Sequence, residues 1–523
     1  MGLLRSASVF SGLTLVSRLF GLVRDQILAI VFGPGAGLDA FWVAFKIPNF
    51  MRRLFAEGAF SQAFVPVLGE YKVQQGDTAV RELISRVSGS LALVLLGITI
   101  VGMVVFPWLI LKYGPMAIDN EQKLVLTADM LVLTLPYILF ISLTALAGGV
   151  LNTYKRFAVP AFTPVFLNLC LIGVSLWLAP MFPEGSEVMA LAWGVFIAGI
   201  VQLLFQFPFL AKLGLLRWPK YGFNHPGVKQ IIRLMLPAIV GSAVVQINLM
   251  IDLIIAYTLL PDSSVSWLTF SDRLVEFPLG VFGIAIATVI LPSLSQHHAK
   301  TDPDKFSRVM DWGIRWSLLI GLPSMVGLLL LAGPLLTTLF NYGAFTQHDV
   351  LMSQMSLFAY AAGLLAFIWV KVLTPGFYSR QDTKTPVRIA VLAMFTNIVL
   401  NLAFVLPWMH YGLPGAHTGL AIATTIAAFL NAGLLFLTLK RQGVYKLEAG
   451  WGRLLLQIFA ALGLMFALLF FGVPELGEWF SWPFWQRALM LSTWVSAGAI
   501  CYFVGLYVFG FRLGAFRSGM TSG

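Results

Sequence analysis

Charged side chains interrupt an apolar stretch, residues 37–70, that is long enough to cross a bilayer. Its interior holds Asp39, Lys46, Arg52, Arg53 and Glu57, and Glu70 ends it. A helix that enters the membrane near residue 38 carries both arginines close to the bilayer centre, because each residue advances about 1.5 Å. Each such cation costs roughly 2.5–3.5 kcal/mol on insertion scales, so the protein, water or a ligand must satisfy it.

Helical spacing gathers most of these charges on one side of the stretch. At about 100° per residue, one stripe holds Asp39, Lys46, Arg53 and Glu57. Asn49 lies beside this stripe, and Arg52 lies about 100° away from Arg53. Pro48 interrupts the backbone hydrogen bonds just before the arginines and predicts a kink there. We interpret the stripe as a polar wall that faces a cavity between helices.

A second group of charges occupies the preceding apolar stretch, residues 6–32. Arg18 and Asp25 share a face with Gly21, and Arg24 lies to one side of that face. Residues 6–32 and 38–69 together hold five cations and three acids, so two positive charges are in excess: Arg18, Arg24, Lys46, Arg52 and Arg53 against Asp25, Asp39 and Glu57. This surplus suits a dianion such as a pyrophosphate, whose oxygens match the planar donors of arginine. The alternative is internal ion pairing that serves packing only.

Polar residues recur in three later apolar stretches. Arg273 and Glu276 are three residues apart, which predicts local pairing, with exposure of Arg273 to the shared cavity as the alternative. Asn397 and Asn401 lie one helical turn apart, and Asp252 has no adjacent cation. Because Na⁺ favours oxygen ligands, these three residues predict a Na⁺ or proton site. Hydrogen bonding between helices is the alternative.

The composition shows which elements must position these residues. The chain has 523 residues, of which 59% are hydrophobic and 11% charged, and its mean hydropathy is +0.86. These values predict an all-α polytopic membrane protein, since the apolar runs are continuous rather than alternating. Cys170 and Cys501 both lie in apolar runs, so we expect neither a disulfide nor a metal centre from them.

The apolar runs predict fourteen transmembrane helices, at roughly 6–32, 38–69, 87–111, 124–151, 158–181, 187–210, 231–260, 265–295, 313–340, 350–377, 387–407, 414–439, 453–473 and 485–510. With a cytoplasmic N-terminus, 24 of the 34 Lys and Arg residues fall in or beside inside loops. Only Lys112, Lys123 and Arg487 fall outside. This bias predicts cytoplasmic termini, and it attributes the net charge of +11 to membrane topology rather than to nucleic-acid binding.

Two pairs of similar short segments, here called echoes, suggest an internal repeat. Trp42 and Phe45 have the same spacing as Trp267 and Phe270, and a proline follows each pair, Pro66 in one case and Pro292 in the other. The loop 152–160 likewise resembles the loop 377–386. Both echoes are six spans apart, which predicts a parallel repeat of two six-helix lobes and an extra pair of helices. The predicted boundaries are 1–212 for the first lobe, 213–445 for the second and 446–523 for the pair.

Some motifs are missing from the sequence. It contains no GxxxxGK[ST] phosphate loop and no evident Ser/His/Asp or Cys/His constellation. Transport against a gradient would therefore draw on an ion gradient or the membrane potential, which contributes about 2.3 kcal/mol per charge per 100 mV. Two rival functions are a drug or cation antiporter, which would need surplus acid in the cavity, and a polyprenyl-dependent glycosyltransferase, which would need carboxylates near a membrane face.

Four stretches resemble the MurJ (MviN) family, bacterial lipid II flippases of the multidrug/oligosaccharidyl-lipid/polysaccharide exporter superfamily. They are GLVRDQILAIVFG (21–33), DAFWVAFKIPNFMRRLFAEGAFSQAFVPVL (39–68), SDRLVEFPLGVFGIAIATVILPSLS (271–295) and PGFYSRQDTKTPV (375–387). The resemblance implies two six-helix lobes in a V, with helices 13 and 14 beside a groove for a polyprenyl tail. It also implies lipid II as the substrate, that is, undecaprenyl-pyrophosphate carrying the peptidoglycan disaccharide-pentapeptide.

The same resemblance implies roles for particular residues and a place in the cell. Family residues that matter for function match Arg18, Arg24, Arg52, Arg53, Arg273 and Asp39. Some members hold Na⁺ in the second lobe, where Asp252, Asn397, Asn401 and Thr418 fall in the corresponding helices. We therefore expect alternating access in the bacterial inner membrane, with Na⁺ or H⁺ coupling left open. Expected partners are lipid II, membrane lipids and other cell-wall synthesis proteins, and the alternative cargo is another polyprenyl-linked saccharide or a drug.

Overall fold

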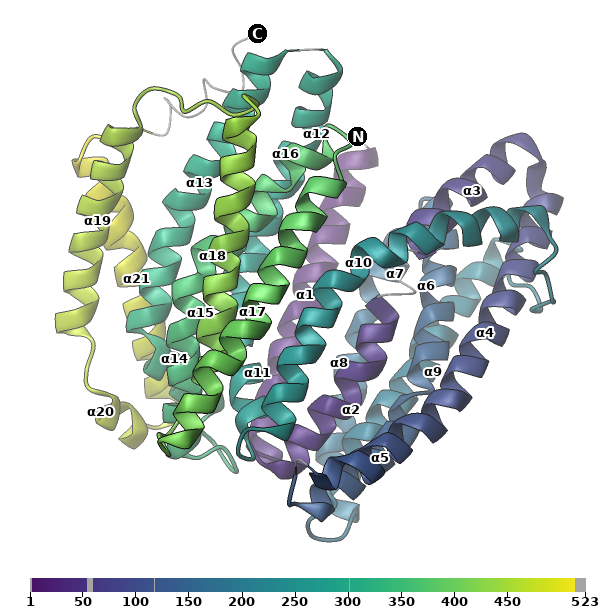
Figure 1. The fold of residues 1–523 in the computed structure, drawn as a ribbon, viewed down its shortest axis with the longest axis horizontal. Helices are drawn as coiled ribbons and strands as arrows, with labels where there is room; N and C mark the ends of the chain where they lie inside the picture. Colours follow the sequence, from purple (N-terminus) through teal and green to yellow (C-terminus); the bar gives the residue numbers. More distant parts are fainter. Residues whose placement is uncertain (1, 54–59, 117, 301, 513–523) are drawn as a thin grey trace. The chain divides into compact units, whose positions relative to one another are not determined.

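A computed structural model describes residues 2–53, 60–116, 118–300 and 302–512, and every regular element in that part of the chain is helical (Figure 1). The all-α prediction is thus confirmed for these residues. The chain forms two compact units, which we call unit 1 (Met1–Ser266) and unit 2 (Trp267–Gly523).

In its described part, unit 1 contains eleven α-helices, the last of which continues into unit 2. In chain order they are α1 (Gly2–Val31), α2 (Ala36–Arg52), α3 (Ser61–Gln74), α4 (Gly76–Tyr113), α5 (Glu121–Thr134), α6 (Tyr137–Thr153), α7 (Ala158–Phe162), α8 (Pro164–Gly173), α9 (Met189–Lys212), α10 (Pro226–Thr258) and α11 (Ser264–Pro278). Its core packs α3, α4, α6 and α9 around Phe64, Leu83, Val150 and Leu210. Close packing of these side chains, rather than their removal from water, holds the helices together, because lipid tails are as apolar as the core.

Unit 2 continues from α11 through a π turn at Leu279–Gly283. Its helices are α12 (Ile284–Ala299), α13 (Pro303–Leu330), α14 (Ala332–Phe340), α15 (Gln347–Leu373), α16 (Pro375–Tyr378), α17 (Lys384–His410), α18 (Thr418–Arg441), α19 (Trp451–Gly472), α20 (Leu476–Ser481) and α21 (Phe484–Val508). A core that includes Leu319, Ile458, Leu469 and Tyr502 packs α13 against α19 and α21. The C-terminal helix pair therefore belongs to the packed body of unit 2.

Eleven helical segments among the described residues are long and apolar enough to span a membrane. They correspond to eleven of the fourteen predicted spans. The three others coincide with α1, with α2 and α3, and with α10. The span predicted at 38–69 is divided, because α2 ends at Arg52 and α3 begins at Ser61. Glu57, one of the predicted site residues, lies outside the described residues.

The two loops that echo each other in sequence also share their backbone conformation. Lys155 and Gln381 both adopt a left-handed conformation with φ of 60°. In the first loop the amide of Arg156 donates to the carbonyl of Leu151, and in the second the amide of Asp382 donates to that of Phe377. Both are the six-to-one hydrogen bond of a Schellman helix ending. This local agreement supports the predicted repeat, whereas the arrangement of two six-helix lobes stays a prediction.

Arg487 is buried, although the sequence analysis counted it as an exterior charge. Its guanidinium donates to the backbone carbonyls of Thr337, Asn341 and Phe480 at 3.3, 3.1 and 2.9 Å. Two of these carbonyls belong to the C-terminal end of α14, where unpaired carbonyls attract a cation. Arg487 thereby ties α14 and α20 to the start of α21.

A buried carboxylate fixes the connection between α18 and α19. Oδ1 of Asp311 on α13 accepts hydrogen bonds from the Tyr445 hydroxyl at 2.7 Å and from the Trp451 indole at 2.8 Å. Its other oxygen lies 2.5 Å from Nε of Arg315. Burial, followed by the hydrogen bond to Asp311, raises the pKa of Tyr445, so the phenol remains a donor at neutral pH.

We expect Asp311→Ala to destabilise unit 2 by about 3 kcal/mol, because it leaves a part-buried guanidinium and two donors without their acceptor. The apparent Tm of the purified full-length protein in detergent should fall by roughly 5–10 °C. Asp304→Ala, an exposed acid in the first turn of the same helix, is the matched control and should change the Tm little. Equal Tm values for the two variants would contradict the assigned role.

Candidate functional site

A cavity of about 560 Å³, which we call the unit 1 cavity, opens between helices of unit 1. It is lined from α2 by Asn49 and Arg52, from α6 by Tyr137, Thr144 and Asn152, from the α7–α8 region by Thr163, and from α9 by Gln202 and Gln206. No carboxylate is among its described lining residues. The cavity therefore combines one cation with many neutral hydrogen-bonding groups, which suits an anionic, hydroxyl-rich ligand.

Arg52, the last residue of α2, lines the cavity. Its Nε donates to Oδ1 of Asn49 at 2.8 Å, one turn earlier, and this bond orients the guanidinium. Arg53, by contrast, is exposed and does not line the cavity. The predicted stripe placed Arg53 on the wall of the cavity. In the structure, Arg52 and Asn49 line the cavity instead.

A chain of hydrogen bonds holds the neutral side of the cavity in place. The Tyr137 hydroxyl donates to Gln202 at 3.2 Å, and Nε2 of Gln202 donates to the carbonyl of Thr163 at 3.2 Å. Nε2 of Gln206 donates to the Thr163 hydroxyl at 3.1 Å. Oε1 of Gln206 is buried and has no hydrogen-bond partner among the described residues. Sequence reasoning missed all four residues, because each looks like an ordinary polar residue in an apolar helix.

Arg24 and Asp25 form an ion pair and do not line this cavity. Nε and Nη2 of Arg24 lie 2.9 and 2.5 Å from Oδ1 of Asp25, and both side chains are buried. Nη1 of Arg24 donates to Asn168 on α8 at 3.1 Å, and Asn168 donates to the carbonyl of Ser17 on α1 at 3.2 Å. This contact matches the packing alternative for these two residues, because it joins α1 to α8.

The other predicted basic residues of unit 1 are dispersed. Arg18 on α1 is exposed, and Lys46 on α2 is half-buried. Neither lines the unit 1 cavity. Of the predicted cations in unit 1, the structure brings Arg52 alone to this cavity among the described residues, and a role in substrate binding stays a prediction for Arg18, Arg24, Lys46 and Arg53.

Asp39 is held by Ser266 at the start of α11. It is completely buried, and its Oδ1 accepts from the backbone amide of Ser266 at 2.8 Å and from the Ser266 hydroxyl at 2.6 Å. Ser266 lies in the first turn of α11, where free amides favour an anion. Oδ2 of Asp39 has no hydrogen-bond partner among the described residues. The carboxylate therefore caps α11 from another helix.

Lys123 contacts the connection between α10 and α11, just before the helix that Asp39 caps. Its buried ammonium lies 2.7 Å from Oδ1 of Asp262 and 4.4 Å from the centre of the Tyr257 ring. Asn120, which caps α5, donates to the other oxygen of Asp262 at 3.3 Å. We call the contacts Asp39–Ser266 and Lys123–Asp262 the α10–α11 latch. Sequence reasoning counted Lys123 as an exterior loop charge and had no signal for this long-range pair.

The predicted residues of unit 2 make local contacts. Nη1 of Arg273 lies 2.8 Å from Glu276, as their spacing predicted. Nδ2 of Asn401 donates to Asn397 at 3.0 Å, and Nδ2 of Asn397 donates to Thr424 on α18 at 3.3 Å. The second bond joins α17 to α18, which fits the alternative of hydrogen bonding between helices.

The remaining residues of the predicted cation site belong to different units. The Thr418 hydroxyl is buried and has no hydrogen-bond partner among the described residues. Asp252 belongs to unit 1, where Asn248 donates to it at 3.5 Å. A Na⁺ site made of Asp252, Asn397, Asn401 and Thr418 therefore stays a prediction.

Known proteins resemble this chain over almost its full length. A family described as "Lipid II flippase MurJ" matches residues 28–484. A probable lipid II flippase MurJ from Vibrio cholerae is 47% identical, with 98% of this chain and 97% of the relative covered. A lipid II flippase MurJ from Burkholderia cenocepacia is 40% identical, with 99% of both chains covered.

Solved structures extend the comparison to the fold. One described as "Lipid II flippase MurJ, inward closed conformation" has a TM-score of 0.76 at 26% identity, with 96% of this chain and 98% of that chain covered. An inward-facing multidrug resistance transporter of the MATE family, from the MOP superfamily, has a TM-score of 0.65 at 16% identity, with 84% of this chain and 98% of that chain covered. The second match concerns the fold alone.

Proposed function

The chain belongs to the lipid II flippase MurJ family, and from this premise we propose that it moves lipid II from the cytoplasmic to the periplasmic leaflet of the inner membrane by alternating access. Lipid II is the cargo named for its relatives. The eleven apolar helices agree with a multi-pass membrane protein. The protein would relocate this lipid rather than convert it chemically.

The observation that carries this proposal is the basic unit 1 cavity. Arg52 offers planar donors to a pyrophosphate, and no described lining residue supplies an opposing carboxylate. The tyrosine, threonine and glutamine side chains around it can bind sugar hydroxyls. At about 560 Å³, the cavity is within the range of small-molecule sites, about 300–1,000 Å³. It would therefore take the pyrophosphate and adjoining sugar, while the polyprenyl tail stays in the bilayer.

The α10–α11 latch supplies a gate for alternating access. With the proposed lobes at 1–212 and 213–445, Asp39 and Lys123 belong to the first lobe, and Ser266 and Asp262 to the second. All four residues lie near helix ends that the proposed topology assigns to the periplasmic side. The latch would hold that side closed while the cavity is open to the cytoplasm, and it would break for release.

Several finer features belong to the same proposal. We infer fourteen transmembrane helices, with α1, α2 together with α3, and α10 added to the eleven apolar segments. Both termini would be cytoplasmic, as the positive-inside bias predicts. Arg273 would contribute to the cavity from the second lobe, and Na⁺ or H⁺ would couple to transport through Asp252, Asn397, Asn401 and Thr418. An inside-negative potential opposes inward return of an anion and would drive the cycle.

Purified protein in liposomes provides the test. Fluorescent lipid II should change leaflet faster than in protein-free liposomes, without any new product by mass spectrometry, and undecaprenyl phosphate without a head group serves as the control cargo. An imposed potential or a Na⁺ gradient should alter the rate. Equal rates with and without protein would overturn the proposed function, and indifference to both gradients would overturn the coupling alone.

A further inference from the structure

The connection between α9 and α10 contains residues 216–221. We call these residues the basic-aromatic segment. Their sequence is Leu-Arg-Trp-Pro-Lys-Tyr, and all six side chains are exposed. Trp218 and Tyr221 are 88% and 63% exposed. Exposure of two large aromatic rings beside two cations is costly in water but typical of a membrane interface.

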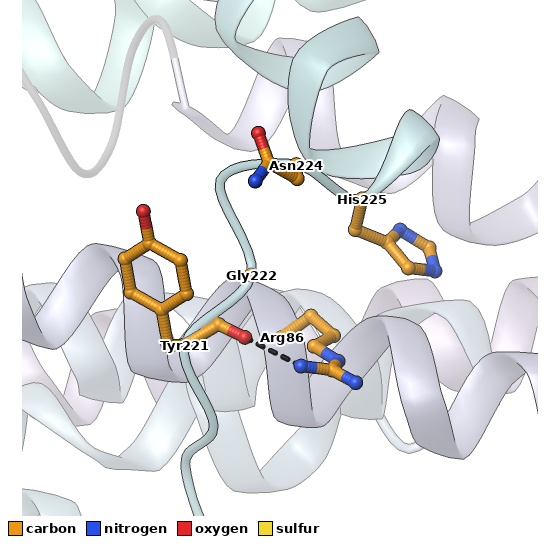
Figure 2. Close-up of a pocket in the computed structure, with 5 residues that line it drawn as sticks. All are labelled: Arg86, Tyr221, Gly222, Asn224 and His225. Carbon is orange, nitrogen blue, oxygen red and sulfur yellow. Dashed lines mark hydrogen bonds between the residues drawn. The ribbon is translucent and has the colours of Figure 1, made fainter.

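The backbone of this segment is held firmly on α4. The amide of Lys220 donates to the carbonyl of Ser85 at 2.9 Å, and the Ser85 hydroxyl donates to the carbonyl of Trp218 at 2.6 Å. Nη1 of Arg86 donates to the carbonyl of Tyr221 at 2.6 Å, while the Tyr221 ring points away from it (Figure 2). Backbone groups of the segment are thus hydrogen-bonded to α4, and its side chains remain available to another partner.

A glycine on α4 permits this close approach. A Cβ atom at Gly89 would lie 2.2 Å from the carbonyl oxygen of Lys220, so any larger residue would push the segment off the helix. The segment also borders a cavity of about 280 Å³ lined by Arg86, Tyr221, Gly222, Asn224 and His225 (Figure 2). The sequence therefore holds the segment in one fixed conformation rather than leaving it as a loose loop.

The charge along this part of the chain has one sign, and the adjoining acid of α4, Glu82, is paired with Arg86 at 3.5 Å. Residues 212–233 contain five basic residues and no acid: Lys212, Arg217, Lys220, Lys229 and Arg233. All five are exposed. The segment begins four residues after Lys212, where an apolar span ends, so it lies at the boundary of the hydrocarbon core. Basic side chains at such a boundary attract anionic lipids, and Trp and Tyr rings rest at the depth of the head groups.

We propose that residues 216–221 form a fixed docking surface for the anionic phospholipid head groups of the cytoplasmic leaflet. Arg217 and Lys220 bind the head groups, and Trp218 and Tyr221 insert at the interface. The assignment to that leaflet rests on the proposed orientation of the chain. An acidic protein would satisfy the two cations equally well, but it would leave no reason for a tryptophan exposed at the edge of an apolar span.

The test measures which lipid surrounds the segment. Leu216, the exposed first residue of the segment, is replaced by cysteine in a Cys170→Ala, Cys501→Ala background and labelled with a fluorophore. The full-length protein is then placed in phosphatidylcholine bilayers. A doxyl quencher is then added on phosphatidylglycerol or on phosphatidylcholine at equal mole fraction. We expect about threefold stronger quenching by the anionic lipid, and a weaker preference in 0.5 M NaCl because salt screens the attraction.

The variant Arg217→Gln, Lys220→Gln should bring the two lipids close to equal quenching. Lys384→Gln, Arg388→Gln removes the same charge from two exposed residues of α17 and should preserve the preference. Three results would overturn the proposal. The two lipids could quench the labelled protein equally, or neither could quench it, as expected for a segment covered by protein. The third is a lipid preference that survives Arg217→Gln, Lys220→Gln. Lipid II translocation measured in parallel distinguishes such a failure from failure of the proposed function.

Discussion

Arg52→Ala is expected to lower the rate of lipid II translocation about 10- to 100-fold. The guanidinium lines the unit 1 cavity, and loss of a hydrogen bond to a charged group costs about 1.5–3 kcal/mol, with tenfold in rate for each 1.4 kcal/mol. Arg52→Lys should be intermediate, because an ammonium keeps the charge but loses the planar fork of donors. In cells depleted of the native protein, lipid II should accumulate in the inner leaflet at normal protein level.

Two further variants sharpen this test. Lys112→Ala removes an exposed cation from the far end of α4 and should leave translocation unchanged. Arg53→Ala removes the exposed neighbour of Arg52. Its translocation rate tests whether the substrate contacts the polar stripe that the sequence predicted, which includes Arg53, or the cavity, which Arg52 lines. If Arg52→Ala translocates lipid II normally, the cavity argument fails. If Arg53→Ala is equally impaired, the ligand site extends beyond the unit 1 cavity.

Asp39→Ala is expected to open the α10–α11 latch and to impair translocation. It removes the acceptor of two hydrogen bonds, from the amide and hydroxyl of Ser266, and so leaves the first turn of α11 without its cap. Loss of a helix cap lowers stability by about 0.5–2 kcal/mol, and loss of a charged acceptor lowers it further. Because the latch would hold the periplasmic side closed, the equilibrium should shift towards the outward-open state by about tenfold or more.

Reaction of a cysteine at the latch reports this shift. Ser264 is completely buried at the start of α11, and Ser264→Cys should react with an impermeant maleimide about ten times faster in the Asp39→Ala protein. Ser266→Ala should have a smaller effect, since the backbone amide remains. Glu121→Ala removes an exposed acid from the first turn of α5 and should have none. Unchanged reactivity in Asp39→Ala would contradict a gating role.

Lys123 shows where counting charges along a sequence falls short. The positive-inside pattern depends on where basic residues fall between spans, and Lys123 entered it as an exterior charge. In the structure it is buried and pairs with Asp262, which is 139 residues away. Arg487 was counted in the same way and is equally buried. Neither contact has a local signature, because the partners are distant in the chain or are backbone carbonyls.

The repeated loops show the opposite case. The conformation of 151–156 and 377–382 depends on bonds within six residues and on one left-handed position in each. Such information is local, so the similarity was visible in the sequence. The same holds for the pair of Arg273 and Glu276, whose spacing places the two side chains one turn apart.

The sequence by itself determined the class of the protein, its family and the local elements, because apolar length, helix endings and long matching stretches are properties of adjacent residues. Only the tertiary structure decided which charge faces the unit 1 cavity and which is neutralised. Arg52 and Arg53 are adjacent and chemically identical, yet one lines the cavity and the other is exposed. That difference arises from the packing of α2 against its neighbours, because the cost of burying a charge depends on what surrounds it.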